Sequence, residues 1–303
     1  MSIANGNWRP VSILKYMPSA YAHALSEEAC FTRFFAVAMA FLAMSVSRAW
    51  GRLQLSSVFT RDCCTKQLKP GLSLMTNLIA RAMKDKSRPD RDVSRDARDN
   101  TSKVLSFIGI APKQFVVDFL PFRGYYTRLF ASIVGEQGHV FAAVPDALTR
   151  IERIEKGRAE IEAFAFDLPN LTLINGRPEL AGSPPVPVDI FFISQNYHDL
   201  HDEFMGPVDI AKFNTSVFQC LKPGGKYIII DHAAANSATP DVTETLHRIR
   251  PAVVREEVEA AGFVYRNKST ALSNDRDPKT GSIFGRTTRY HTDRFILKFE
   301  KPV

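Results

Sequence analysis

Residues 115–134, FVVDFLPFRGYYTRLFASIV, contain the pattern that decides the fold. Phe115 to Leu120 form a short apolar run, which is typical of a strand buried on both faces. Tyr126 to Val134 have the apolar spacing of a helix that packs on one side. Pro121 and Gly124 lie in the turn between them, where each residue type ends one element and lets the next begin. This stretch therefore predicts a strand, a tight turn and a helix, which is the first half of a βαβ unit.

The alternation of apolar runs and helical stretches continues from there to the C-terminus. Six more strands are predicted, at residues 139–144, 171–175, 189–194, 226–231, 263–265 and 294–299. Helices are predicted between them, at residues 147–164, 204–220 and 244–261. Strands that alternate with helices form a mainly parallel sheet covered on both faces, so we expect a Rossmann-like three-layer α/β sandwich over residues 101–303. The last strand is expected to pair antiparallel with the strand before it.

The net charge of +7 is distributed unevenly along the chain. Residues 1–100 hold 15 Lys and Arg against 8 Asp and Glu, whereas residues 101–303 hold 24 of each kind. A domain that binds nucleic acid needs a basic surface to neutralise phosphates, so we expect no nucleic-acid partner. The four cysteines show neither the pattern of a disulfide framework nor metal-ligand spacing.

The first 100 residues differ from the rest in apolar periodicity and in charge density. Residues 1–75 show weak periodicity and are predicted to be a separate, poorly defined appendage. Within them, residues 34–47 (FFAVAMAFLAMSVS) are too short for a membrane span of roughly 20 residues, but they have the length of a signal-peptide core. Export, contact with a membrane surface and an ordinary buried helix all remain open, so the localisation is not predicted. Residues 76–100 are dense in charges of both signs and are predicted to be a charged linker or an exposed helix.

The turn after the first strand is the main candidate for a ligand site. In doubly wound sheets, ligands bind beyond the carboxyl ends of the strands, at the point where the strand order reverses. Gly124 lets the backbone come close to a ligand, and the helix that follows presents free N–H groups. The turn lacks the G-x-G-x-x-G fingerprint, which argues against NAD or FAD.

Six segments occur in a characteristic order between residue 80 and the C-terminus: RDARDN, VVDFLPFRGYYTRLF, NYHDLH, LKPGGKYIIIDHAA, TLHRIRPAVVREEVEAAGF and TDRFILKFEKP. Together they resemble a family of predicted bacterial small-molecule methyltransferases of class I, over about two-thirds of the chain. The resemblance implies a seven-stranded, mostly parallel sheet whose last strand is antiparallel. It also implies S-adenosyl-L-methionine as the cofactor and a small molecule as the methyl acceptor.

The resemblance also indicates which residues bind the cofactor. They are Asp118, Leu120, Pro121, Gly124 and Tyr125 around the first turn, and Asp146 after the second strand.

One departure from the family concerns the first turn. The family has three glycines after the proline, where this chain has Phe122, Arg123 and Gly124. A large side chain there can fill the space for the methionine part of the cofactor or force the backbone away from a positive φ. The alternative is therefore a catalytically silent binding protein that keeps the methyltransferase fold.

The residues after the fourth predicted strand are candidates for catalysis. We expect Asn196 to orient the acceptor and Tyr197 to stack on the cofactor or on a planar substrate. His198 is expected to accept a proton from the acceptor near neutral pH. The structural alternatives are a tyrosine that only packs and a histidine on the surface.

Two further polar groups flank this segment. His201, Asp199 and Asp202 lie close to His198 in sequence, but no further ligand can be identified, so no metal site is predicted. Asp231 and its neighbour His232 end the fifth predicted strand at the same edge of the sheet.

Overall fold

The structure is a computed structural model of the 303-residue chain. It describes residues 70–177, 183–206 and 208–303. The predictions for residues 1–69, including the apolar stretch 34–47, lie outside the described residues. In the part of the chain that is described, no helix has both the length and the apolar character to span a membrane.

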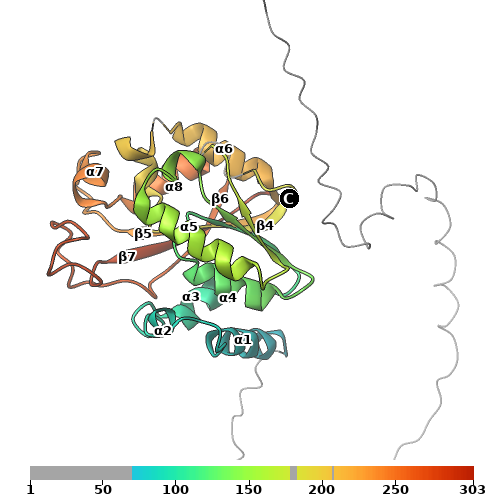
Figure 1. The fold of residues 1–303 in the computed structure, drawn as a ribbon. Helices are drawn as coiled ribbons and strands as arrows, with labels where there is room; N and C mark the ends of the chain where they lie inside the picture. Colours follow the sequence, from blue (N-terminus) through green and yellow to red (C-terminus); the bar gives the residue numbers. More distant parts are fainter. Residues whose placement is uncertain (1–69, 178–182, 207) are drawn as a thin grey trace, which may run out of the picture. The chain divides into compact units, whose positions relative to one another are not determined.

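A seven-stranded sheet forms the centre of the described region, in the order β3-β2-β1-β4-β5-β7-β6 (Figure 1). Strands β1 to β5 run parallel to one another, and β7 is antiparallel to both of its neighbours. The α/β class, the seven strands and the antiparallel pairing of the last strand are therefore confirmed. The strands are β1 (Phe115–Phe119), β2 (His139–Ala143), β3 (Leu171–Ile174), β4 (Val188–Ser194), β5 (Leu221–His232), β6 (Val264–Ser269) and β7 (Arg294–Glu300).

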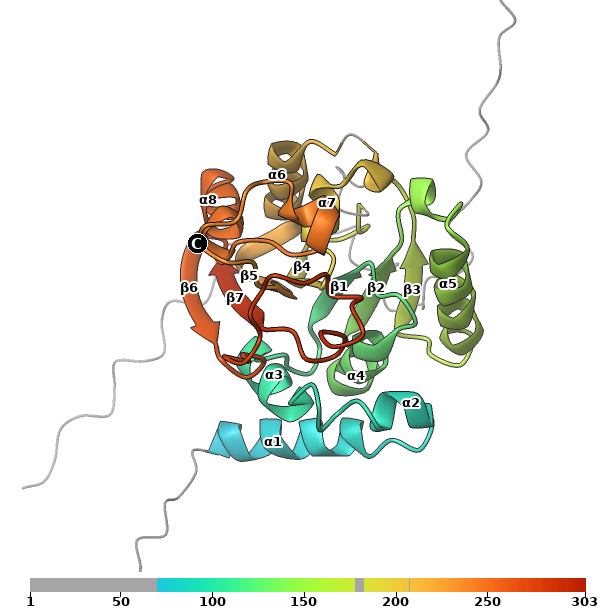
Figure 2. The same ribbon diagram turned by 90° about the vertical axis from the view of Figure 1, so that its left-hand side faces the viewer.

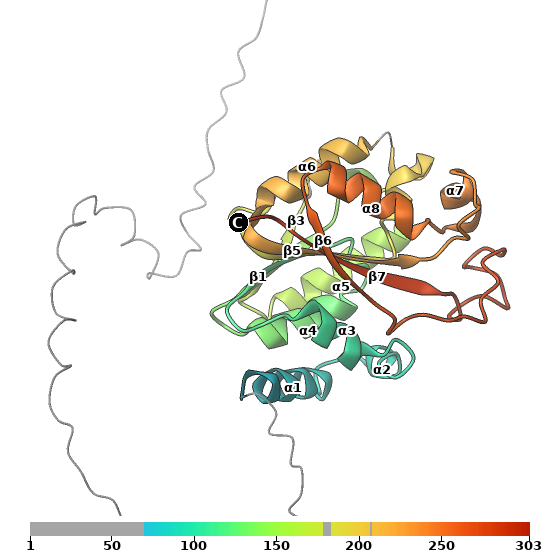
Figure 3. The ribbon, with the colours of Figure 1, turned by 180° about the vertical axis from the view of Figure 1, so that it is seen from behind.

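Helices cover both faces of the sheet, as Figures 2 and 3 show. One face is covered by α6 (Ile210–Cys220) and α8 (Pro251–Ala260), and the other by α3 (Thr101–Ile108) and α4 (Tyr125–Val134). Helix α1 (Pro70–Met83) packs on the outside of α3 and α4. Each layer has its own cluster of buried apolar side chains, because successive strand residues point to opposite faces. The remaining helices are α2 (Asp90–Val93), α5 (Glu152–Ala165), α7 (Val242–Leu246) and the short 3₁₀ turns η2 (Asp146–Leu148), η4 (His198–His201) and η5 (Glu203–Met205).

The charged stretch 76–100 packs against this domain. Ile79 and Ala82 of α1 belong to the buried cluster that also contains α3 and α4 side chains. The Arg88 guanidinium is buried and lies 2.7 Å from the Asp96 carboxylate. Opposite charges therefore neutralise one another at the domain surface, so this stretch is more than the solvated linker that its composition suggests.

Three predicted helices differ from the observed ones. The helix predicted at 147–164 begins only at Glu152, after the short turn η2. The helix predicted at 204–220 begins only at Ile210, where the Asp209 carboxylate caps it by accepting a hydrogen bond from the Lys212 N–H at 3.0 Å. The helix predicted at 244–261 is divided into α7 and α8. Pro251 starts α8, since proline has no N–H to donate to a preceding turn and is favoured at a first helical position.

Candidate functional site

The strand order reverses between β1 and β4. From β1 the chain proceeds outward to β2 and β3, whereas β4 leads to β5 on the other side. The carboxyl ends of β1 and β4 therefore border the crevice in which doubly wound folds bind ligands. Three residues other than glycine have a positive φ there, namely Leu120 (+53°), Phe122 (+53°) and Gln195 (+62°). Such conformations are strained in L-residues and concentrate at functional sites.

The turn after β1 lies tightly against α5. Gly124 has a φ of +76°, and a Cβ added there would lie 2.6 Å from Cζ of Phe164. Only glycine fits this position, for both reasons. A Cβ on Gly157 would in turn lie 2.6 Å from the carbonyl oxygen of Phe122, so the backbone of the turn and α5 are in close contact.

Phe122 and Arg123 are the two bulky residues of this turn. Phe122 keeps a positive φ, and its side chain is 44% exposed. At Phe122, therefore, the side chain is compatible with a positive φ. Arg123 lies beside α5, with Nε 3.6 Å from a carboxylate oxygen of Glu160.

Asp118 is the buried acidic group at this point of the sheet. It pairs in register with residues of both β2 and β4, and its side chain is only 3% exposed. Thr127 Oγ1 of α4 donates a hydrogen bond to Asp118 Oδ2 at 2.6 Å. Burial raises the pKa of Asp118 to about 7, although the bond from Thr127 acts in the opposite direction.

The other residues predicted to bind the cofactor lie in the turn, on the surface or in the core. Leu120 and Pro121 form the turn itself, where the Pro121 carbonyl accepts a hydrogen bond from the Gly124 N–H at 2.9 Å. Asp146 is exposed, at the start of η2 just beyond β2. Tyr125 is buried, and its hydroxyl donates to the Asp96 carboxylate at 2.6 Å, so this hydroxyl is bonded within the domain.

Asn196 links the two strand ends at the reversal point. Its Nδ2 donates to the carbonyl of Ser194 at 2.7 Å and to the carbonyl of Leu120 at 3.2 Å. The side-chain hydroxyl of Ser194 is buried and has no hydrogen-bond partner in the described structure. A fixed amide and a free hydroxyl thus lie at the end of β4, where a ligand would be bound.

Tyr197 points away from the crevice. Its side chain is fully buried between α6 and α8. Its hydroxyl donates to Glu257 Oε2 at 2.9 Å and accepts a hydrogen bond from Asn214 Nδ2 at 2.8 Å. A ring enclosed in this way cannot stack on a ligand, so Tyr197 belongs to the core and its predicted stacking role is corrected.

His198 is held between carboxylates. Its Nδ1 lies 2.8 Å from Asp231 Oδ1, and its Nε2 lies 3.1 Å from Asp199 Oδ1. Burial alone would lower the pKa of His198, but these two carboxylates raise it well above its usual value. Asp231 therefore holds Nδ1, while Nε2 faces Asp199, and the role of His198 as a base stays a prediction.

His198 also belongs to a compact group of four side chains that sequence spacing does not reveal. His198, Asp199, Asp202 and His247 each place one nitrogen or oxygen atom within 4.8 Å of the others. Three of them are close in sequence, but His247 comes from the end of α7. Because its spacing from His198 matches no metal-binding pattern, only the fold brings it into the group.

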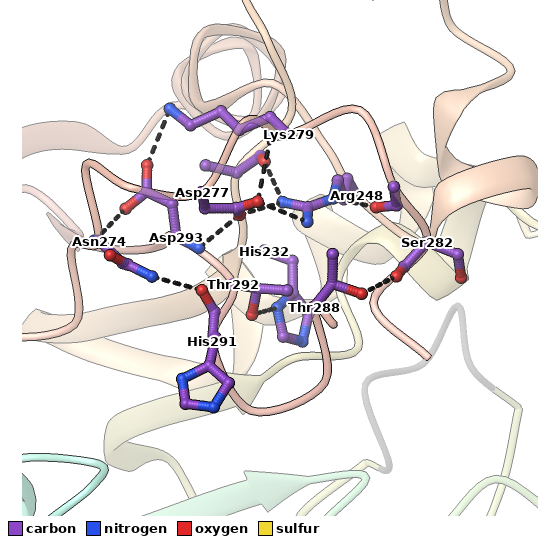
Figure 4. Close-up of polar contacts among 12 residues, drawn as sticks. His232, Arg248, Asn274, Asp277, Lys279, Ser282, Thr288, His291, Thr292 and Asp293 are labelled. Carbon is purple, nitrogen blue, oxygen red and sulfur yellow. Dashed lines mark hydrogen bonds and ion pairs between the residues drawn. The ribbon is translucent and has the colours of Figure 1, made fainter. Parts of the chain in front are cut away.

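The loop between β6 and β7 folds beside the carboxyl end of β5, as Figure 4 shows. The fully buried Arg248 guanidinium forms two hydrogen bonds with the Asp277 carboxylate, at 2.7 and 3.1 Å. His232 Nδ1 lies 2.8 Å from Thr292 Oγ1, and burial lowers the pKa of His232 to about 3. His232 is therefore a neutral core residue, and Arg248 is a structural residue that the sequence analysis missed.

No family model and no curated protein matches the sequence. Similar solved structures were found. A SAM-dependent methyltransferase from Aquifex aeolicus is 17% identical, with a TM-score of 0.47 over 75% of this chain and 98% of that chain. A putative sarcosine dimethylglycine methyltransferase from Galdieria sulphuraria is 11% identical, with a TM-score of 0.48 over 77% of this chain and 99% of that chain. Aeropyrum pernix fibrillarin, with natively bound S-adenosyl-L-methionine, is 11% identical, with a TM-score of 0.42 over 63% of this chain and 67% of that chain.

The topology of the sheet allows the fold to be classified. Five parallel strands, the reversal between β1 and β4, and an antiparallel β7 inserted between β5 and β6 form one sheet. Helices cover both of its faces. The described part of the chain therefore has a Rossmann-like, doubly wound α/β fold with one antiparallel strand near the edge of the sheet.

Proposed function

We propose that this protein transfers a methyl group from S-adenosyl-L-methionine to a small-molecule acceptor. The observation that carries the proposal is the meeting of three features at the reversal between β1 and β4. They are the buried Asp118, the strained turn from Leu120 to Gly124, and the Asn196 amide that joins the two strand ends. In a doubly wound fold, this is the position of the ligand.

The residues present fit the chemical groups of this cofactor. The methionine part carries an ammonium group, and a carboxylate such as Asp118 suits it. Asp118 is bonded to the hydroxyl of Thr127, and no ion pair occupies it among the described residues. Asp146, exposed beyond β2, suits hydrogen bonds from ribose hydroxyls. The positions of Asp118 and Asp146 at the carboxyl edge of the sheet support the two proposed contacts.

The chain's contribution to catalysis would be positioning. The bound cofactor supplies a methyl group that its sulfonium already activates, so alignment of donor and acceptor provides much of the rate. Asn196 would fix the distance between the β1 turn and the end of β4 through its two hydrogen bonds. Tyr197 and His198 hold this segment against α8 and β5, so we propose them as positioning residues.

Isothermal titration with S-adenosylhomocysteine tests the cofactor proposal. We expect wild-type protein to bind one equivalent, and Asp118→Asn to bind at least about tenfold more weakly, a loss of about 1.4 kcal/mol. The matched control is Asp275→Asn, which changes an exposed aspartate of the β6–β7 loop and should bind like wild type. Phe122→Gly combined with Arg123→Gly should bind more tightly, because the turn then needs no strained side chain.

The same titration separates the proposal from its alternative. A catalytically silent protein with this fold would bind neither S-adenosylhomocysteine nor S-adenosyl-L-methionine, and the glycine substitutions would be required to create binding. Where wild-type protein binds, a screen of small-molecule acceptors for methylated product completes the test. Equal affinity of wild type and Asp118→Asn would exclude the proposed position of the cofactor.

A further inference from the structure

The group His198, Asp199, Asp202 and His247 lies beyond the carboxyl ends of β4 and β5. We call it the His/Asp cluster. Its first three members belong to η4 and the residue that follows it, and His247 ends α7, which packs against η4. The four candidate ligand atoms all lie within 4.8 Å of one another. Four potential ligands from two separate elements thus converge on one point.

Three distances within the His/Asp cluster are compatible with ligands around one metal ion. Asp199 Oδ1 lies 3.1 Å from His198 Nε2 and 3.9 Å from His247 Nδ1, and Asp202 Oδ2 lies 3.6 Å from His247 Nδ1. Two ligand atoms that are each about 2.1 Å from a shared ion are about 3.0 Å apart at right angles and about 4.2 Å apart when opposite. The two longer separations exceed hydrogen-bond length, so these groups are not bonded directly to one another.

Asp202 provides an independent argument for a cation. Its side chain is 1% exposed, and neither carboxylate oxygen has a hydrogen-bond partner in the described structure. Thr243 of α7 lies nearby, yet forms no well-defined hydrogen bond with these oxygens. A buried carboxylate without a hydrogen-bond partner is unfavourable, and coordination to a cation removes this cost.

His198 is oriented as a metal-binding histidine is. Such a histidine usually donates its other ring N–H to a carboxylate, which fixes the ring and leaves the remaining nitrogen for the ion. Here Nδ1 lies 2.8 Å from Asp231 Oδ1. Asp231 is itself fixed, because it also accepts hydrogen bonds from the backbone N–H groups of His198 and His232, at 2.8 and 2.7 Å. His198 Nε2 is therefore directed toward the rest of the cluster.

We propose that the His/Asp cluster binds one divalent transition-metal ion through His198 Nε2, His247 Nδ1 and the carboxylates of Asp199 and Asp202. Two imidazoles and two carboxylates suit zinc and its first-row neighbours, whereas magnesium and calcium prefer oxygen ligands alone. The backbone at His247 supports this, because its φ of +53° is a strained conformation that places the ring beside Asp202. The proposal does not depend on methyl transfer.

Metal titration of the full-length protein, after removal of metal with a chelator, tests the proposal. We expect one equivalent of Zn²⁺ to bind, and one equivalent of Co²⁺ to produce visible d–d absorption. Asp202→Asn and His247→Gln should each weaken binding by about 100-fold or more, which is at least the effect of removing a partner of a metal ligand. The matched control is His201→Gln, in the same 3₁₀ turn. His201 Nε2 lies 2.9 Å from Glu257 instead, so this variant should bind like wild type.

Thermal unfolding keeps the test decisive if a substitution affects folding. Zn²⁺ should raise the Tm of wild type and of His201→Gln, but not that of Asp202→Asn. Without metal, Asp202→Asn should unfold at the same temperature as wild type or higher, because it removes a buried charge whose oxygens have no hydrogen-bond partner. The proposal is overturned if wild type binds less than one equivalent, or if the cluster variants bind as tightly as wild type.

Discussion

Replacing Asp118 by asparagine is expected to stabilise the protein at alkaline pH while weakening cofactor binding. The cause is the buried position of Asp118, which raises its pKa to about 7. In an unfolded chain an aspartate has a pKa of about 3.9. At a pH between these two pKa values, the Asp118 carboxyl keeps its proton in the folded state and loses it in the unfolded state. The free energy of unfolding therefore falls as the pH rises from about 4 to about 7.

The magnitude follows from the pKa of Asp118. Between pH 5 and the folded pKa of about 7, the loss is about 1.36 kcal/mol per pH unit, or about 3 kcal/mol in all. Asparagine has nearly the same shape, and its amide oxygen can accept the same hydrogen bond from Thr127. It carries no charge, so this source of pH dependence is absent from Asp118→Asn.

Urea denaturation followed by circular dichroism at pH 5 and pH 8 measures the effect. The stability of Asp118→Asn relative to wild type should increase by about 3 kcal/mol between the two values. Asp275→Asn, in an exposed loop, should show no such increase. Other titrating groups cancel in this comparison because they are common to both proteins. An unchanged difference between Asp118→Asn and wild type would refute the reasoning.

Three more predictions concern the frame around the site. Gly124→Ala should lower the free energy of unfolding, measured by urea denaturation, by about 2–3 kcal/mol. The alanine would combine a positive φ with a methyl group 2.6 Å from a ring carbon of α5. Gly109→Ala, which has a similar φ and meets only a movable lysine end, should cost about 1 kcal/mol. Burial alone would raise the pKa of Asp99, but nearby arginines lower it to about 2. The free energy of unfolding should therefore decrease as the pH falls from about 4 to 2, and Asp99→Asn should lack this decrease. A fragment 70–303 should unfold cooperatively, whereas 101–303 should melt lower or aggregate, because it lacks the α1 side chains of the buried cluster.

The sheet could be predicted because its strands are short apolar runs bounded by proline, glycine or charged residues. Such runs are compatible with few structures other than buried parallel strands. The less accurate predictions have physical reasons. The helix predicted at 244–261 satisfied the spacing of apolar residues, but Pro251 can start a helix and cannot continue one. Residues 76–100 were interpreted from composition alone, which does not show that Arg88 and Asp96 neutralise each other.

The site was harder to predict because a sequence shows where a residue lies along a strand but not which way its side chain points. Tyr197 and His198 are adjacent after β4, yet one enters the core against α8 and the other contacts Asp231. His247 could not be found at all, because its neighbours in the His/Asp cluster are distant in sequence. The polar character of the edge was therefore predictable, and the role of each group was not.

The backbone conformation gives the strongest link between these groups. Leu120, Phe122, Gln195 and His247 all have a positive φ without being glycine, and all four lie at or near the carboxyl edge of the sheet. Each costs roughly 1–2 kcal/mol relative to an ordinary conformation. Side-chain burial does not explain the conformation of Phe122, because the residue is 44% exposed. Glycine at these positions would give the same backbone without the strain. Backbone strain of this kind concentrates at functional sites, which agrees with the proposed positions of the cofactor and the metal ion at this edge.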